Sequence, residues 1–129
     1  MRISAELLER AEQRVNPNLE RELVIRGLGI PSIENMAAAR DDFDAWDLSN
    51  NRIMRLENLP RVKRLKSLYC AGNIIESIDA RNLSENASNI TSLSLSHNNI
   101  SSLLEMVSLG KACPKLEFLS LDGNPVTSK

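Results

Sequence analysis

Short stretches of alternating apolar and polar residues recur along the chain, and an asparagine follows each stretch at the same offset. Four segments, "FDAWDLSNNRI", "LKSLYCAGNII", "ITSLSLSHNNI" and "LEFLSLDGNPV", share one order of apolar positions around that asparagine. The asparagines are Asn51, Asn73, Asn98 and Asn124, and the intervals between them are 22, 25 and 26 residues. A fainter copy, "ERELVIRGLGI", precedes them. Self-similarity at such a period indicates a repeat protein.

All four segments fit the leucine-rich-repeat template L-x-x-L-x-L-x-x-N-x-L, with other apolar residues substituting for some leucines. The alternating part of each repeat predicts a short strand, because side chains of a strand point to opposite faces in turn. The residues predicted to point inward are Leu23, Ile25, Trp46, Leu48, Leu68, Cys70, Leu93, Leu95, Leu119 and Leu121. We therefore expect an α/β solenoid with about five parallel strands on its concave face and short helices or turns on its convex side.

The recurring asparagine has a structural explanation. After each strand the chain turns sharply, and buried backbone amide and carbonyl groups at the turn need partners. An asparagine side chain offers both donors and acceptors. Asn51 is therefore predicted to belong to an internal hydrogen-bonded ladder, whereas its neighbour Asn50 is predicted to be exposed.

The whole chain, 1–129, is predicted to form one domain. Residues 1–18 are expected to be a helical N-terminal cap, with Ser4 capping a helix from Ala5 to about Val15. Residues 19–129 hold the repeats, with a helix at about 103–109 that Ser102 begins and Gly110 ends. Pro60 limits the segment around it to a helical turn at most. Nothing after Val126 resembles a C-terminal cap, so we expect the chain to be a fragment of a longer protein.

Composition narrows the possible functions. The net charge of −1 is too small for non-specific nucleic-acid binding by the whole surface. Cys70 stands at a leucine position, and Cys113 lies far along the chain, so both are expected to be free thiols in a reduced compartment. The sequence contains neither a signal peptide nor an apolar run of membrane-spanning length, and we expect a soluble protein.

Catalytic and metal-binding chemistry is poorly represented. The sequence contains one histidine, His97, at a variable position before a ladder asparagine, where exposure to solvent is expected. Four acids, Asp41, Asp42, Asp44 and Asp47, form a cluster that we interpret as solvated rather than as a metal site or the centre of a hydrolase. We therefore expect a non-enzymatic protein without a cofactor.

The concave face offers better candidates, because strand residues between the inward positions need not pack in the core. One predicted column reads Val24, Asp47, Tyr69, Ser94 and Ser120, and its neighbours read Glu22, Ala45, Ser67, Ser92, Phe118 and Arg26, Ser49, Ala71, Ser96, Asp122. Exposed aromatic residues anchor protein partners. The predicted partner-binding residues are Glu22, Val24, Asp47, Tyr69, Ser94 and Phe118. The alternative for Phe118 is that it folds against a neighbouring repeat.

Basic residues gather in two places. The segment 52–66 contains six Lys and Arg residues and one acid, Glu57. A solvated surface is the simple interpretation, and contact with RNA phosphates is the alternative. Arg21 and Arg26, beside the first strand, are expected to form a second basic site at the rim. The RNA-contact candidates are Arg21, Arg26, Arg52, Arg55, Lys63 and Arg64.

The segments "RELVIRGLGIPSIEN", "DDFDAWDLSNNRI", "LPRVKRLKSL" and "DGNPVTSK" resemble the A-prime family of the spliceosomal U2 small nuclear ribonucleoprotein. The resemblance covers essentially the whole chain and is most specific over 21–35. In that family Arg21 and Arg26 match basic residues at the N-terminal rim. The sequence departs from the family at Trp46, Tyr69 and Cys70.

The resemblance implies a nuclear scaffold in pre-mRNA splicing that is not an enzyme. Its concave face would bind a helix of an RNA-recognition-motif partner, the B-double-prime protein, and the pair would bind a stem-loop of U2 snRNA. It implies no cofactor, membrane or small-molecule substrate. Two other binding modules have similar repeats: acidic leucine-rich nuclear phosphoproteins, which continue into an acidic tail, and phosphatase-regulating repeat proteins.

Overall fold

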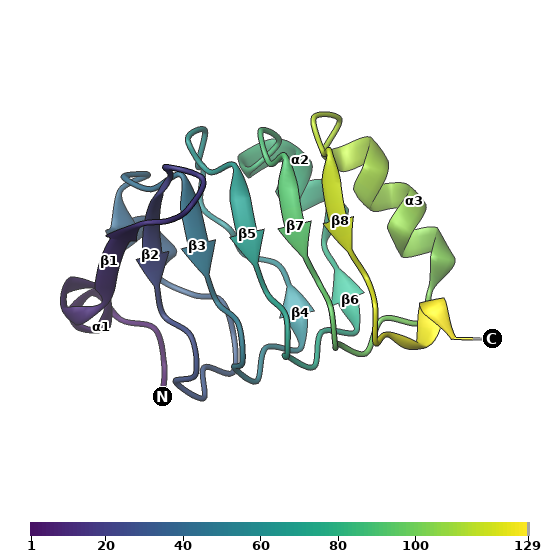
Figure 1. Cartoon of the computed structure of the whole chain (residues 1–129), viewed down its shortest axis with the longest axis horizontal. Helices are drawn as coiled ribbons and strands as arrows, with labels where there is room; N and C mark the ends of the chain where they lie inside the picture. Colours follow the sequence, from purple (N-terminus) through teal and green to yellow (C-terminus); the bar gives the residue numbers. More distant parts are fainter. Residues whose placement is uncertain (129) are drawn as a thin grey trace.

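A computed structural model describes residues 1–128 as a curved stack of repeats with one sheet along its concave side (Figure 1). That sheet has six strands in the order β1-β2-β3-β5-β7-β8. Their bounds are β1 Glu12–Val15, β2 Arg21–Val24, β3 Ala45–Asp47, β5 Ser67–Tyr69, β7 Ser92–Ser94 and β8 Phe118–Ser120. The strands from β2 to β8 pair in parallel, which confirms the five predicted parallel strands.

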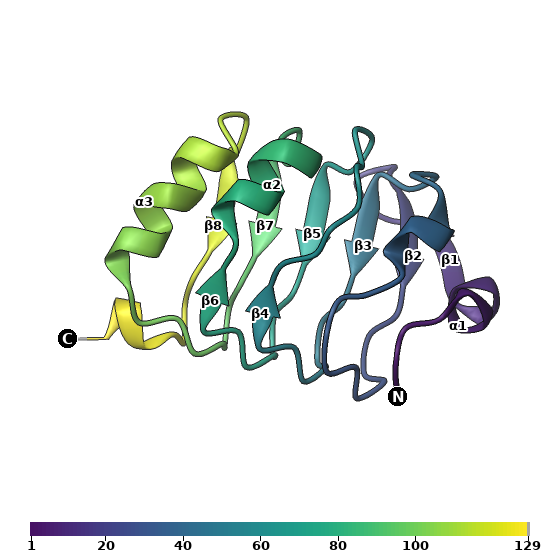
Figure 2. The same ribbon diagram turned by 180° about the vertical axis from the view of Figure 1, so that it is seen from behind.

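The convex side carries short elements (Figure 2). Two short strands, β4 and β6, pair in parallel, and helical segments lie between the strands of the main sheet. Their bounds are β4 Arg55–Leu56, β6 Ser77–Ile78, α2 Ala80–Asn86, α3 Leu103–Ala112 and the 3₁₀ turns η1 Met36–Ala39 and η2 Pro125–Thr127. The segment around Pro60 contains no helix, in agreement with the expectation of at most one turn.

The core lies between the sheet and the convex elements. The inward residues of the first four parallel strands are all buried, and they are Leu23, Ile25, Trp46, Leu48, Leu68, Cys70, Leu93 and Leu95. In the last strand, Leu119 is 39% exposed, because β8 is the final strand of the sheet. Cys70 and Cys113 are buried free thiols, as predicted. Burial raises the pKa of the Cys70 thiol to about 12.

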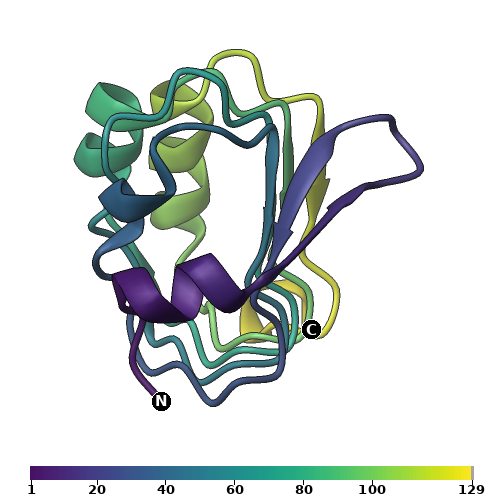
Figure 3. The same ribbon diagram turned by 90° about the vertical axis from the view of Figure 1, so that its left-hand side faces the viewer.

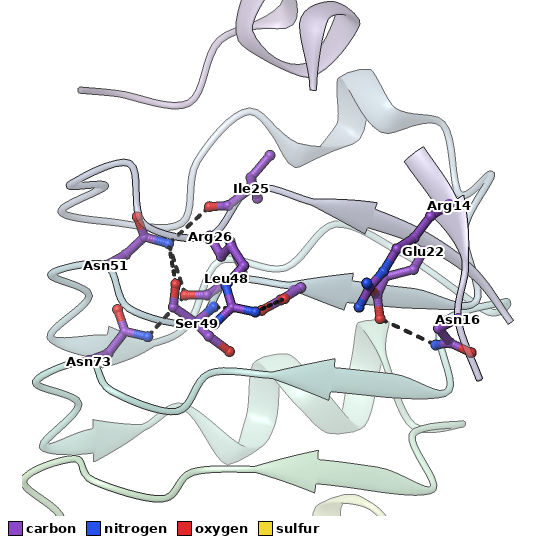
Figure 4. A network of polar contacts seen from close by, with 10 residues as sticks. Arg14, Asn16, Glu22, Ile25, Arg26, Leu48, Ser49, Asn51 and Asn73 are labelled. Atoms are coloured by element: carbon purple, nitrogen blue, oxygen red, sulfur yellow. Dashed lines mark hydrogen bonds and ion pairs between the residues drawn. The ribbon is translucent and has the colours of Figure 1, made fainter. Parts of the chain in front are cut away.

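The asparagine ladder is present in all four repeats. The side-chain amide of Asn51 donates to the carbonyls of Ile25 and Leu48 at 3.0 and 2.9 Å (Figure 4). Asn73 donates one repeat later to Leu48 and Cys70. Asn98 and Asn124 repeat the arrangement. Each amide therefore joins the carbonyl of its own strand to that of the preceding one. Asn50 is exposed, as predicted.

The N-terminal cap differs from the prediction. Ser4 caps the helix as expected, but α1 spans only Ala5–Arg10. The prediction of helix to Val15 is wrong, because β1 pairs antiparallel with β2 instead (Figure 3). The turn between β1 and β2 projects on the concave side of the sheet (Figure 3). Asn16 closes this hairpin turn, because its side-chain oxygen accepts the amides of Asn18 and Glu20.

The helix predicted at 103–109 exists but is longer. Ser102 accepts the amide of Glu105, as expected of a helix N-cap, and α3 continues to Ala112. Gly110 lies inside α3 and does not end it, because the amide of Cys113 still bonds to Leu109. No helix in the described part of the chain is long and apolar enough to cross a membrane.

Candidate functional site

The strand register aligns the concave residues into the predicted columns. Across β2, β3, β5, β7 and β8 the paired positions are Val24, Asp47, Tyr69, Ser94 and Ser120, and in the adjacent column Glu22, Ala45, Ser67, Ser92 and Phe118. Backbone hydrogen bonds extend this register to the residues just beyond the strands, as from Gly27 to Ser49. The concave face is therefore a regular surface with one row per repeat.

Exposure along these columns increases toward the C-terminal strands. Phe118 is 67% exposed, so it does not fold against a neighbouring repeat. Tyr69, Val24 and Ser94 are partly exposed. An aromatic ring on β5 and another on β8 thus face the same side of the sheet.

The Glu22 side chain is not exposed on the concave face, although the sequence pattern predicted that it would be. It is 1% exposed, because the β1–β2 hairpin covers it. The Nε atom of Arg14 lies 2.6 Å from Glu22 Oε2, and the amide of Asn16 donates to Glu22 Oε1 at 3.2 Å (Figure 4). The hydrogen bond and charge of Glu22 raise the pKa of the Arg14 guanidinium.

Asp47 is also buried, at 5% exposure. Its Oδ1 accepts the amide of Ser49 at 3.0 Å, and its Oδ2 lies 3.7 Å from Nη1 of Arg26. The concave carboxylates are therefore already paired within the chain. Any contribution of Glu22 or Asp47 to partner binding remains a prediction.

A hollow of about 360 Å³ lies between the hairpin turn and the sheet. Its walls come from the turn on one side and from the central strands on the other, and its lining residues are Arg14, Asn16, Pro17, Asn18, Glu22, Asp47, Ser49, Tyr69 and Ser94. Arg14, Asn16 and the turn were not among the site residues predicted from the sequence. The signal was Asn16-Pro17-Asn18, a turn sequence between two short polar-apolar runs.

Arg21 and Arg26 do not form the single basic site that was predicted for them. Arg21 begins β2 and Arg26 lies two residues after its end, so the two residues are about 16 Å apart along an extended chain. Arg21 lies near Arg64, because Asp44 accepts the backbone amide of Arg21 and also pairs with Arg64, each at 2.9 Å. Lys63 adjoins Arg64 at this rim.

The remaining basic candidates lie elsewhere. Arg52 follows β3 and lies in the turns at the opposite rim, as Arg26 does. Arg55 lies in β4 on the convex side (Figure 2). The guanidinium carbon of Arg21 lies 5.2 Å from the centroid of the Phe43 ring, which is a cation–π geometry. Three of the six candidates therefore lie at one rim, two lie at the opposite rim and Arg55 lies on the convex side, so they do not form one basic surface.

The acidic cluster has a structural role that the sequence analysis did not foresee. Asp41 accepts the backbone amides of Lys63 and Arg64 in the next repeat. The hydrogen bonds of Asp44 with Arg64 and with the Arg21 amide hold the pKa of its carboxyl below the ordinary value. These carboxylates are thus bound between repeats and not simply solvated.

The described residues also bear on metal binding. Among residues 1–128, no cluster of three or more His, Cys, Asp or Glu side chains is arranged to hold a metal ion. His97 is exposed, as expected, with Nε2 3.7 Å from Asp122 Oδ2. The candidate site is therefore a sheet surface with two aromatic residues, a hollow beside it and basic residues at both rims.

Comparisons with known proteins agree with this architecture. A family model described as leucine-rich repeat matches residues 1–129. The chain therefore belongs to the leucine-rich-repeat family, as predicted.

Within this family its relatives are U2 small nuclear ribonucleoprotein A′ proteins. The protein of Mycosarcoma maydis is 43% identical over 98% of this chain and 51% of its own length, and the human protein is 39% identical over 100% and 50%. The crystal structure of the Drosophila melanogaster SNF/U2A′ complex contains a chain that is 41% identical with a TM-score of 0.95, covering 100% of this chain and 73% of that one. The resemblance to the A-prime family is confirmed, and the chain spans about half the length of the curated relatives it matches.

Proposed function

We propose that this chain acts as a non-enzymatic scaffold within the U2 small nuclear ribonucleoprotein during pre-mRNA splicing in the nucleus. Its concave face binds an RNA-recognition-motif partner of the B-double-prime kind, and the pair binds a stem-loop of U2 snRNA. The observation that carries the proposal is the pair of aromatic side chains, Tyr69 and Phe118, on an otherwise small and polar sheet.

Two comparisons support this proposal. The relatives at 39% to 43% identity carry the name of the U2 A′ protein. The similar solved chain comes from a complex in which U2A′ is bound to a second protein, SNF. The near-neutral charge of the present chain also favours binding to a protein first, since strong phosphate binding needs clustered cations.

Tyr69→Ala is expected to weaken binding of the partner by about 2 kcal/mol or more, because buried aromatic residues dominate protein interfaces. Isothermal titration calorimetry with a B-double-prime-like protein measures the change. Tyr69→Phe is the matched control, since it keeps the ring and is expected to keep most of the affinity. Unchanged affinity in both Tyr69→Ala and Phe118→Ala would contradict binding through the concave face.

The basic rims are expected to act on RNA and not on the protein pair. Arg21→Glu should leave the pair intact and weaken its ternary complex with U2 stem-loop RNA, in a manner that high salt imitates. For Arg26 the neutral change Arg26→Gln is preferable, because Asp47 lies 3.7 Å away and a new acid would repel it. Filter binding of RNA with and without the partner separates the two steps.

Tight binding of the RNA by the isolated chain would contradict this division of roles. Loss of the protein pair in Arg21→Glu would contradict it as well. Lys111→Glu, a charge reversal at an exposed residue of α3, tests whether any effect belongs to Arg21 itself or to net charge alone.

A further inference from the structure

The turn between β1 and β2 displays an apolar side chain in an unfavourable backbone conformation. Leu19 is 85% exposed and has a φ of 61°. Bulky L-residues avoid positive φ, because Cβ approaches the following carbonyl oxygen, whereas glycine and asparagine tolerate it. Neither stability nor solubility favours a leucine at this position. Strained, exposed residues of this kind occur preferentially at binding sites.

The turn is a fixed feature and not a loose loop. Asn16 is buried and closes it from within: its amide donates to the carbonyl of Glu20, and its carbonyl accepts the amide of Leu19, each at 2.9 Å. The side-chain oxygen of Asn16 also accepts the amides of Asn18 and Glu20 at 3.0 Å. The conformation of Leu19 is therefore imposed by its surroundings.

The turn is also attached to the middle of the concave face. The hydroxyl of Ser67 on β5 donates to the carboxylate of Glu20 at 3.0 and 2.9 Å to its two oxygens. This bond joins residues 47 positions apart and holds the hairpin over the sheet. Figure 3 shows the hairpin standing out from the stack on the side of the main sheet.

The position of the turn makes it one wall of the hollow described above. Pro17 and Asn18 line the hollow on the turn side, and Tyr69 and Ser94 line it on the sheet side. A ligand that covers Tyr69 and enters the hollow therefore meets the turn.

We infer that the Asn16–Glu20 turn is a second contact arm for the protein partner, and that Leu19 is its apolar anchor. The inference rests on the proposed function, since the occupant is the same RNA-recognition-motif protein, whose helix lies along the concave columns. The turn closes over one end of that helix, and Leu19 buries against an apolar side chain there. Asn16 is the positioning residue that holds the arm in place.

Leu19→Asn distinguishes a contact role from a structural role, because it is expected to keep or raise the stability of the free chain while it lowers the affinity for the partner. Asparagine relieves the strain at positive φ, so the thermal midpoint of the free chain should rise or stay constant. The affinity for a B-double-prime-like protein should nevertheless fall at least tenfold. Leu104→Gln is the matched control: Leu104 is 78% exposed on α3, away from the concave face, and its replacement should leave the affinity unchanged.

A more stable Leu19→Asn chain with wild-type affinity overturns the contact arm and leaves the proposed function standing, provided that Tyr69→Ala still weakens binding. If the unaltered chain does not bind the partner at all, the proposed function itself fails. Asn16→Ala, which loosens the turn, is also expected to lower the affinity for the partner. Adding Leu19→Asn to Asn16→Ala should lower that affinity little further.

Discussion

Replacing Trp46 with alanine is expected to lower the free energy of unfolding by about 3 to 5 kcal/mol. Trp46 is 1% exposed, and β3 places it between Leu23 and Leu68 of the two flanking strands. Hydrogen-bonded strands hold both neighbours in place, so the cavity left by the indole cannot collapse easily. The loss should therefore lie toward the upper end of that range. Urea unfolding followed by circular dichroism measures it.

Trp46→Leu is the control, because leucine is the residue that the repeat template places at this position. It should restore more than half of the lost stability by filling much of the cavity. Trp46 is also the only tryptophan of the chain, so the unaltered protein should emit at short wavelength and shift to longer wavelength on unfolding. A native spectrum typical of solvent-exposed indole, or a loss under about 1 kcal/mol in Trp46→Ala, would show that the core register is different.

The parallel strands could be predicted because two independent signals coincide in every repeat. Alternation defines which residues point inward, and the asparagine at a fixed offset defines where the strand ends. A shift of one residue would expose Leu68 and bury Tyr69, and the ladder contacts of Asn73 would be lost. The register of β5 was therefore fixed by the sequence pattern alone.

The N-terminal hairpin could not be predicted in the same way. The segment 5–15 has apolar residues at helical spacing, and Ser4 is a good helix cap, so a helix through Val15 was the simplest prediction. What ends the helix at Arg10 is a non-local effect: each of residues 12–15 pairs with a residue of β2 at the edge of the sheet. Pairing of this kind depends on the position of β2 in the stack, which local propensity does not report.

The same hairpin explains why Glu22, which was predicted to be exposed at the candidate site, is buried. Strand geometry correctly placed Glu22 and Asp47 on the concave face, but exposure depends also on what lies above that face. Arg14 and Asn16 cover Glu22, and Arg26 folds back to Asp47. Toward the other end of the sheet no such cover exists among the described residues, so the expectation of exposure was correct for Phe118.

Asn73→Asp is expected to lower the free energy of unfolding by about 4 kcal/mol or more, although the two side chains have nearly the same shape. The Asn73 amide donates to the carbonyls of Leu48 and Cys70, each at 3.0 Å, while its oxygen accepts the amide of Ile53. An ionised aspartate accepts only, so two buried carbonyl oxygens would lose their donor and face a negative charge. Protonation restores one donor and removes the charge. The folded variant would therefore bind its proton more readily than the unfolded chain, and the deficit should shrink as pH falls and grow as pH rises.

Asn50→Asp provides the matched control, because it makes the same chemical change at an asparagine in an exposed turn. Asn50 has a φ of 58°, a conformation that aspartate also tolerates, and its backbone amide keeps the bond to the carbonyl of Ala71. The expected loss is at most about 0.5 kcal/mol and independent of pH in the neutral range. Chemical denaturation of both variants between acidic and neutral pH tests the pair. Equal losses in the two variants would mean that the asparagines are turn formers only, and that the ladder through the core contributes little to the stability of the stack.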